Sequence, residues 1–264
     1  MFFIGVGVNR QFSNPYDPLA VDYFNRVVAN GDTSLTPSQQ NALNNKFIAL
    51  RNAGYGTSNI DRLFAEQYCY TAIQALTPFI WNGLGNGLGV AVGSPTFTAG
   101  VGWTHNGSSY INTNYNPSIN GSNYVLNNAG IYFNGNIDTS KAFGQFISGA
   151  SDGTNIIYFN YSVSSNIFFG INTLSYNYSN TISSVTSVQD RRISSTQDKS
   201  IINSTSEHTQ SANSSSIPNY NLYYGAVNAA NIAQYSLANN AVTNFICYGN
   251  SSLDKSVLAS ALAS

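Results

Sequence analysis

The side chains best suited to chemistry lie in residues 103–118, Trp-Thr-His-Asn-Gly-Ser-Ser-Tyr-Ile-Asn-Thr-Asn-Tyr-Asn-Pro-Ser, where aromatic, amide and hydroxyl groups occur with almost no charge. An aromatic ring such as Trp103 can stack on a sugar ring, and an amide such as Asn106 can hydrogen-bond sugar hydroxyl groups. This chemistry suits the binding of neutral polar partners. We therefore predict a glycan-binding surface with the candidate residues Trp103, His105, Asn106, Tyr110, Tyr115, Tyr158 and Tyr161.

Two of these candidates have a plainer interpretation, which we favour. Trp103 can fill the core of a β-fold, and His105 can stand at the top of a hairpin that turns at Asn106-Gly107. Asn-Gly between aromatic and β-branched residues is the strongest short-range hairpin signal. The stretch is then structural, with a strand on each side of the turn.

Tyrosine-rich segments recur at residues 158–161, 176–178 and 220–224, and the chain holds 18 Tyr. Tyrosine offers a large amphipathic contact area at low entropic cost, and neighbouring Asn and Ser supply adaptable hydrogen bonds. Such segments are typical of binding surfaces. A subunit interface uses the same composition, and composition does not separate the two uses.

The carboxylates are too few for an obvious hydrolase. Glycoside hydrolysis needs two carboxylates across the scissile bond, and the chain has only two Glu, Glu66 and Glu207. Glu207 and His208 are adjacent, so in a strand they point to opposite faces and cannot form a dyad. We expect that the protein is not an enzyme.

A calcium site is the one metal hypothesis that the sequence raises. Asp152 and Asn155, in Asp-Gly-Thr-Asn, could supply oxygen ligands to Ca²⁺. A tight turn between two strands explains the same residues without a metal, and we favour that turn. We expect no metal and no cofactor.

Composition excludes several other classes of function. Only 8% of the 264 residues are charged and the net charge is −1, so the basic surface that binds nucleic acid is missing. We find neither the length of apolar run that spans a membrane nor the pattern of a signal peptide. Cys69 and Cys247 lie in apolar contexts, so we predict two buried thiols, with a disulfide as the alternative.

Helical patterns fill residues 17–70. Asp17 followed by Pro18 predicts the start of a first helix, and Thr36-Pro37-Ser38-Gln39 has the form of a capping box that begins a second. A third, shorter helix is predicted to start near Ser58, with its buried side formed by Ile60, Leu63, Phe64 and Tyr68.

From residue 75 to 264 the pattern changes to short strands between Gly, Asn and Ser turns, which indicates an antiparallel β-sandwich. Residues 179–217 are rich in Ser and Thr and hold much of the charge, so we predict exposed edge strands and loops there. A short C-terminal helix is predicted at 253–262. The predicted strands are 96–98, 109–113, 129–133, 142–147, 156–161, 167–171, 173–178, 222–224 and 244–248.

Residues 1–16 form an apolar arm that we expect to attach the protein to a larger assembly. Exposed apolar arms commonly add as a strand or tether to a partner. The anchoring candidates are Met1, Phe2, Phe3, Ile4, Val6 and Val8.

These features together resemble a known family. The Asp17-Pro18 helix start, the motif Trp103-x-x-Asn106-Gly107-x-x-Tyr110 and the segment Ile147-Ser-Gly-Ala-Ser-Asp-Gly153 precede a terminal helix. This layout is similar to virion structural proteins of phages that infect Bacteroidota, whose main domain resembles the concanavalin A-like lectin/glucanase (laminin-G-like) sandwich.

The resemblance implies a mainly β chain with a concanavalin A-like jelly roll after a small helical region. It implies a virion surface protein, a head fibre or decoration or a tail fibre, made in the host cytoplasm without a signal peptide. Its partners would be other virion proteins, bound through the arm and the helices, and further copies of itself, commonly as a trimer. Cell-surface glycan would be the ligand of the sandwich.

Two other functions stay open. In the first, the protein is purely structural and its Tyr/Asn surface makes subunit contacts. In the second, which the shortage of carboxylates disfavours, it degrades glycans.

Overall fold

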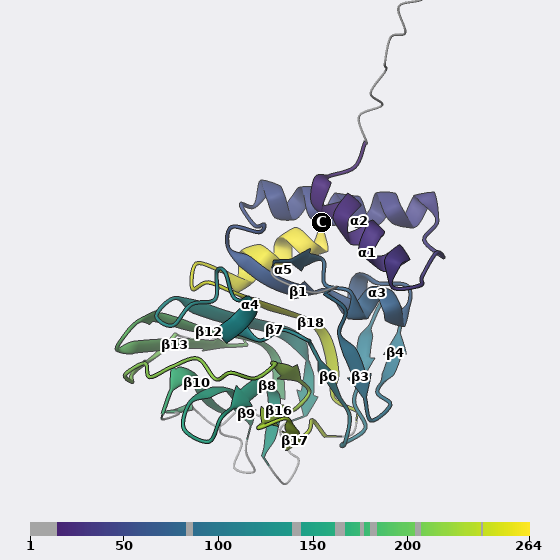
Figure 1. Ribbon diagram of the computed structural model, residues 1–264. Coiled ribbons are helices and arrows are strands. Elements are labelled where there is room, and N and C mark those ends of the chain that lie inside the picture. The colour runs from purple at the N-terminus through teal and green to yellow at the C-terminus, as the bar shows by residue number, and fades with distance from the viewer. Residues whose placement is uncertain are drawn as a thin grey trace, which may run out of the picture.

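The computed structural model describes residues 15–82, 87–138, 144–161, 167–174, 177–179, 184–203, 207–238 and 240–264. Two β-sheets face each other, and helices lie along one side of them (Figure 1). Among the described strands, pairing is antiparallel except between β16 (Val227–Ala229) and β8 (Gln145–Ser151). The predicted antiparallel β-sandwich with a small N-terminal helical region is confirmed.

The first sheet, sheet A, is built around two long central strands that pair with each other, β7 (Ala129–Asp138) and β18 (Val242–Gly249). Two short strands lie off its main path, since β5 (Gly102–Thr104) pairs with β18 and β4 (Thr96–Thr98) pairs with β5. In spatial order the sheet holds β14 (His208–Ser211), β13 (Gln197–Ile202), β12 (Ser184–Ser194), β7, β18, β1 (Ile60–Phe64) and β2 (Ile80–Trp81).

The second sheet, sheet B, faces sheet A across a core of Ile, Phe and Tyr side chains. A short hairpin of β16 and β17 (Ile232–Gln234) extends it beside β8. In spatial order it holds β11 (Asn177–Ser179), β10 (Ile167–Thr173), β9 (Ile156–Tyr161), β8, β15 (Tyr223–Tyr224), β6 (Tyr110–Asn112) and β3 (Val90–Val92).

The helical layer consists of α1 (Pro18–Ala29), α2 (Pro37–Asn52) and α5 (Lys255–Ala263), which lie together in Figure 1. Both predicted N-terminal starts are confirmed, because Asp17 caps α1 and Thr36 forms a reciprocal capping box with Gln39. Asp254 caps α5. The remaining helical turns are η1 (Glu66–Tyr68), α3 (Ala72–Leu76) and α4 (Pro117–Asn120).

The predicted third helix is wrong. Residues 60–64 form β1, a strand buried along its whole length between β18 and β2. A short apolar run does not distinguish a buried strand from a helix by its spacing. Here pairing with β18, from the far end of the sequence, decides the conformation.

The predicted Asn106-Gly107 hairpin is also wrong. Gly107 does adopt a positive φ of 88°, but the strands on its two sides do not pair with each other. β5 pairs with β4 and β18 in sheet A, whereas β6 pairs with β3 and β15 in sheet B. The turn therefore carries the chain from one sheet to the other.

The polar stretch at residues 179–217 is only partly at the surface. β14 is the edge strand of sheet A, as predicted for this stretch. Three of its charged side chains, however, are fully buried: Asp190, Arg192 and Asp198. Arg192 donates to Asp198 at 2.6 Å and to the Ile171 carbonyl at 2.9 Å, so partners within the fold replace water.

The predictions for the two cysteines, for membrane-spanning segments and for the N-terminal arm have different outcomes. Cys69 and Cys247 are buried free thiols, as expected. None of the helices in the described ranges is long and apolar enough to cross a membrane. The anchoring candidates Met1, Phe2, Phe3, Ile4, Val6 and Val8 lie outside the described residues.

The Asp61 carboxylate joins the first strand to a distant loop. It is fully buried in β1 and accepts hydrogen bonds from the backbone N–H groups of Ser122, Asn123 and Tyr124 at 2.9–3.1 Å. The Tyr115 hydroxyl donates to it at 2.8 Å. This set of donors offsets the cost of burying a charge.

We predict that Asp61→Asn lowers the free energy of unfolding by roughly 2–4 kcal/mol, because an amide nitrogen would face donors that need an acceptor. Urea denaturation measures the change. Asp22→Asn is the matched control: Asp22 is exposed and pairs with Arg26 one turn along α1, so its loss should cost about 0.5 kcal/mol or less. Equal losses in the two variants would contradict the role given to Asp61.

Glu66 is an acid buried without an ion partner. It follows β1 in η1, is fully buried, and neither carboxyl oxygen has a hydrogen-bond partner among the described residues. Burial raises its pKa to about 8. The folded protein therefore holds this carboxyl in its neutral form at pH 7.

We predict that the Glu66 carboxyl makes stability fall as the pH rises from about 4.5 to 8. In this window the unfolded chain releases the Glu66 proton and the folded chain keeps it, which costs up to roughly 1.4 kcal/mol per pH unit. Urea denaturation at pH 5, 6.5 and 8 should show a smaller decline in Glu66→Gln than in the unchanged protein. Parallel pH profiles for the two proteins would refute this assignment.

Candidate glycan-binding cleft

Three of the predicted glycan-binding side chains are buried, namely Trp103, Tyr115 and His105. Trp103 is 3% exposed and packs against Phe97 with ring centroids 5.2 Å apart. Tyr115 is fully buried, with its hydroxyl on Asp61. Trp103 lies in the core, as the plainer interpretation proposed, and neither ring presents a face to a ligand.

His105 is buried where the chain crosses between the sheets. Its Nδ1 donates to the Ser109 carbonyl at 3.1 Å, and its ring packs against Gly225, where a Cβ would lie 2.4 Å from the imidazole Cε1. Burial lowers the pKa of His105 to about 4, although the Ser109 contact acts to raise it. The ring is therefore neutral at pH 7 and supports the crossing, contrary to both the glycan-binding and the hairpin-top predictions.

Asn106 is exposed, but its side chain fixes the turn. Its Nδ2 donates to the Gly93 carbonyl at 2.8 Å, and its Oδ1 accepts from the Ser108 backbone N–H at 3.1 Å. These bonds use both ends of the amide.

The tyrosines of sheet B have a different placement. Tyr110 stacks on Tyr223 with ring centroids 4.6 Å apart, and the next residue in each strand, Ile111 or Tyr224, belongs to the core. Tyr110 and Tyr223 therefore lie on the outer side of sheet B, where Tyr110 is half-buried and Tyr223 is covered to 5% exposure. Strand register extends this face, because Tyr223 pairs with Gly149 and Gly149 pairs with Tyr158. Tyr161 lies in β9, and its side chain is outside the described residues.

A cleft opens on this outer face beside Tyr158. We name it the hairpin cleft, because the β16–β17 hairpin forms one wall and the turn between β8 and β9 forms another. Its volume is about 440 Å³, within the range of small-molecule sites. The lining residues are Ser151, Asp152, Gly153, Tyr158, Ala229, Ala230, Ile232 and Gln234.

Aromatic side chains support one side of the hairpin cleft. Phe146 packs edge-on against Tyr158, with centroids 4.9 Å apart, and also contacts Tyr235 at 5.6 Å. Tyr235 and Ile232 are 59% and 64% exposed. Large exposed apolar groups beside a hollow are typical of a binding surface.

The hairpin wall carries unusual backbone conformations. Ala230 and Asn231 have φ values of 52° and 68°, the positive values that a two-residue hairpin turn requires, and Tyr235 has a φ of 53°. A left-handed conformation is costly for Ala and Tyr. The Ala230 N–H donates to the Ser151 carbonyl at 3.2 Å, which holds the hairpin against the end of β8.

Asp152 shapes the other wall through a turn. Its Oδ1 accepts from the backbone N–H groups of Thr154 and Asn155 at 2.9 and 2.7 Å, and the Asn155 amide donates to its Oδ2 at 3.0 Å. Partial burial acts to raise the pKa of Asp152, but these hydrogen bonds outweigh it and hold that pKa below its ordinary value. The turn accounts for both calcium candidates, and the described residues contain no cluster of metal-ligating side chains.

The structure thus brings Tyr158 and Asp152 together and leaves the other described candidates elsewhere. Phe146, Tyr223, Ile232, Gln234 and Tyr235 were not among the predicted site residues. The sequence contains one signal for Tyr223, the tyrosine-rich segment 220–224. It contains none for Gln234 and Ile232, since their position depends on the parallel pairing of β16 with β8.

No protein-family model matches the chain, and no curated protein sequence matches it. Solved structures do show similarity of fold. One is Domain 4 of AbnA, a GH43 extracellular arabinanase from Geobacillus stearothermophilus, in complex with arabinotriose. It is 13% identical with a TM-score of 0.52, and the match covers 77% of this chain and 98% of that domain.

Two further structures are sialidase proteins. A mutant of Trypanosoma rangeli sialidase displaying trans-sialidase activity is 11% identical with a TM-score of 0.50, and the match covers 90% of this chain but only 37% of the sialidase. The CBM40 of a Ruminococcus gnavus IT-sialidase, bound to α2,3-sialyllactose, is 13% identical with a TM-score of 0.41, over 52% of this chain and 83% of the module. At these identities, the likenesses to the arabinanase domain and to the Trypanosoma rangeli sialidase show a shared β-sandwich fold alone.

Proposed function

We propose that this protein is a carbohydrate-binding β-sandwich that holds a neutral glycan in the hairpin cleft, and that it is displayed on the surface of a phage virion. The observation that carries the binding role is the cleft itself, a hollow of about 440 Å³ beside Tyr158 on the outer face of sheet B. Its polar groups come from the turn and from Gln234.

The cleft chemistry favours an uncharged polar ligand. Among the described residues that line it there is no Lys, Arg or His. Asp152, the carboxylate among these described residues, already accepts hydrogen bonds from three nitrogen donors within its own turn. A sugar ring offers apolar C–H faces to the Tyr158 ring and hydroxyl groups to Gln234 and Ser151, which matches this mixture.

The likeness to the arabinanase domain supports the carbohydrate class. That domain is in complex with arabinotriose, and it shares the sandwich fold over nearly its whole length. Fold alone does not define function, so the cleft residues must supply the specificity. An arabinose-containing oligosaccharide is the natural first ligand to test.

We propose binding rather than cleavage. A glycosidase needs a pair of carboxyl groups that flank the scissile bond, and of the described residues that line the cleft only Asp152 is acidic. Glu66 is buried in the interior and Glu207 is paired with Arg191 and Lys199 on sheet A. Neither forms a pair with Asp152.

The virion role rests on the family resemblance and on the separation of two surfaces. Figure 1 places α1 and α2 at one end of the molecule and the β16–β17 hairpin at the other. Attachment through the helices and residues 1–16 would leave the cleft facing outward. We propose attachment to other virion proteins and a closed homo-oligomer, with a trimer as the expected form.

We predict that Tyr158→Ala weakens glycan binding by about tenfold or more, because one stacked ring contributes roughly 1–2 kcal/mol. Binding to an array of arabinose-containing and bacterial surface glycans, followed by titration of the best one, measures the effect. Gln234→Ala should weaken binding of the same ligand, and it should disturb the packing of Phe146, Tyr158 and Tyr235 less than Tyr158→Ala does.

Tyr70→Ala is the matched control, since Tyr70 is 40% exposed and belongs to the segment before α3 rather than to sheet B. It should leave glycan binding unchanged. Equal binding by Tyr158→Ala, Gln234→Ala and the unchanged protein would remove the cleft from the proposal. No binding to any glycan, with a change of oligomeric state in Tyr158→Ala, would favour the purely structural role.

We predict that phage particles whose genome encodes this sequence carry the protein on their outside. Mass spectrometry of purified particles should detect it, and gold-labelled antibodies against the sandwich should decorate either the head or the tail. An antibody against an internal head protein provides the negative control. Absence of the protein from intact particles would refute virion display.

A further inference from the structure

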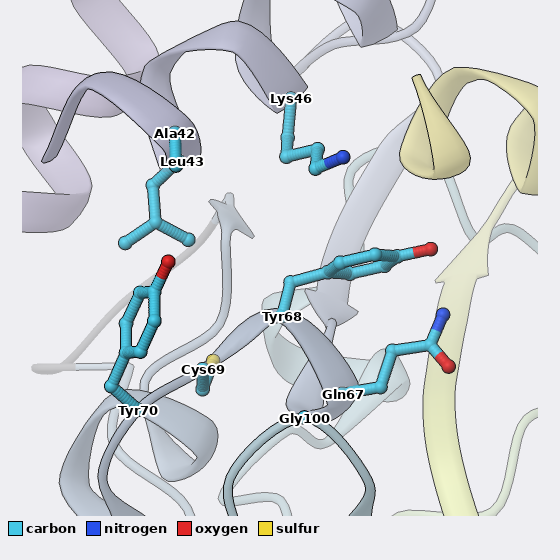
Figure 2. Close-up of a pocket in the computed structure, with 8 residues that line it drawn as sticks. All are labelled: Ala42, Leu43, Lys46, Gln67, Tyr68, Cys69, Tyr70 and Gly100. Atoms are coloured by element: carbon cyan, nitrogen blue, oxygen red, sulfur yellow. The ribbon is translucent and has the colours of Figure 1, made fainter. Parts of the chain in front are cut away.

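A second hollow lies on the helical side of the molecule, away from the hairpin cleft. Figure 2 shows it between α2, the segment at residues 67–70 and the turn at Gly100. Its volume is about 220 Å³. We name it the Lys46 pocket, and its lining residues are Ala42, Leu43, Lys46, Gln67, Tyr68, Cys69, Tyr70 and Gly100.

Lys46 is an unusual cation in this fold. In the described ranges, the other basic side chains are either paired with carboxylates or buried: Arg26 with Asp22, Arg51 with Asp17, Arg191 and Lys199 with Glu207, Arg192 with Asp198, and Arg62 and Lys255 in the interior. Lys46 makes no ion pair within these ranges. It lines a pocket in which no described carboxylate pairs with it.

The ammonium group of Lys46 is held in place by an aromatic ring. Its Nζ lies 5.0 Å from the centre of the Tyr68 ring, in the arrangement of a cation–π contact (Figure 2). Partial burial lowers the pKa of Lys46, since the ammonium loses hydration that no carboxylate replaces. An incoming anion would supply the missing partner.

The wall beneath Lys46 is fixed before any ligand arrives. The Asn244 amide donates to Gln67 Oε1 at 2.9 Å. Burial raises the pKa of the Tyr68 hydroxyl, although the neighbouring Gln67 side chain acts to lower it. On the other side, the Tyr70 backbone N–H donates to Gln74 Oε1 at 2.9 Å. Preorganised walls reduce the entropy lost on binding.

The interior of the Lys46 pocket is apolar. Leu43 and Cys69 are 2% and 1% exposed and line it, with Cys69 between Tyr68 and Tyr70 and Leu43 above the Tyr70 hydroxyl (Figure 2). The Cys69 Sγ is engaged, since it contacts the Ala65 carbonyl at 3.4 Å and the Tyr23 hydroxyl at 3.7 Å. Burial raises the pKa of Cys69, so the thiol stays protonated and acts as an apolar surface.

We propose that the Lys46 pocket binds a small organic acid, a single carboxylate on a compact hydrocarbon group. The carboxylate pairs with Lys46 Nζ at the rim, and the hydrocarbon enters between the two tyrosine rings and contacts Leu43. A purely apolar ligand would leave Lys46 without a partner. A sugar would leave many hydroxyl groups facing an apolar interior, which costs free energy.

The test compares 3-phenylpropanoate with its neutral isostere 3-phenylpropanamide on the full chain, by titration of ¹H–¹⁵N NMR shifts. A ligand of this size should bind the unchanged protein with a Kd of about 1 mM. The amide should bind about tenfold more weakly, because it lacks the charge that pairs with Lys46. The largest shifts should fall on the amides of residues 43–46 and 67–70.

Lys46→Met keeps the length of the side chain and removes its charge, so acid and amide should bind it equally and weakly. Lys199→Met is the matched control, because Lys199 pairs with Glu207 on sheet A, and it should keep the preference for the acid. Equal binding of acid and amide by the unchanged protein overturns the proposal. So does loss of the preference in Lys199→Met.

Acid binding in the Lys46 pocket can be distinguished from glycan binding in the hairpin cleft, on which it does not depend. Tyr158→Ala should not change binding of 3-phenylpropanoate, and the acid should not displace glycan from the hairpin cleft. A parallel loss of acid binding in Tyr158→Ala and Lys46→Met would place both ligands in one site and overturn the assignment to the Lys46 pocket.

Discussion

The hydrogen bonds that the buried Asp61 carboxylate accepts are the interactions on which the sandwich depends. Asp61 lies on β1, which pairs with the last strand, β18, and it accepts hydrogen bonds from a loop more than sixty residues away. Next to it, the Arg62 guanidinium donates to the Asp61 carbonyl at 2.9 Å and lies over the Tyr115 ring. Burial lowers the pKa of Arg62 to about 10, and it remains a cation at pH 7. This group of side chains ties β1 of sheet A to the segment after β6 and to the loop before β7.

Local signals in the sequence predicted the elements that depend on near neighbours. Asp17 and Thr36 begin helices because their side chains accept from backbone N–H groups two or three residues on, and that pattern is visible in the sequence. Strands β4 and β9 fall on their predicted residues for the same reason, because Gly, Asn and Ser turns bound them.

The predictions were wrong where contacts between residues far apart in the sequence determine the structure. The Ile60 to Phe64 segment became a strand through β18, and Asn106-Gly107 crossed between sheets because each flanking strand found a partner elsewhere. For the cleft, Tyr158 was predictable as a surface tyrosine in a strand, but Ile232 and Gln234 were not. Their place beside it comes from the parallel pairing of β16 with β8, and no short-range pattern encodes a parallel pair.

The interior location of so many ionised or ionisable groups has a consequence for the behaviour of the molecule in different media. Asp61, Arg62, Glu66, Asp190, Arg192 and Asp198 are all at most 1% exposed, in a chain with only 21 charged residues. The surface therefore offers little for dissolved ions to screen, and hydration falls to amides and hydroxyls, whose interactions with water depend weakly on ionic strength. The contacts that hold the fold should therefore depend only weakly on the salt concentration of the medium.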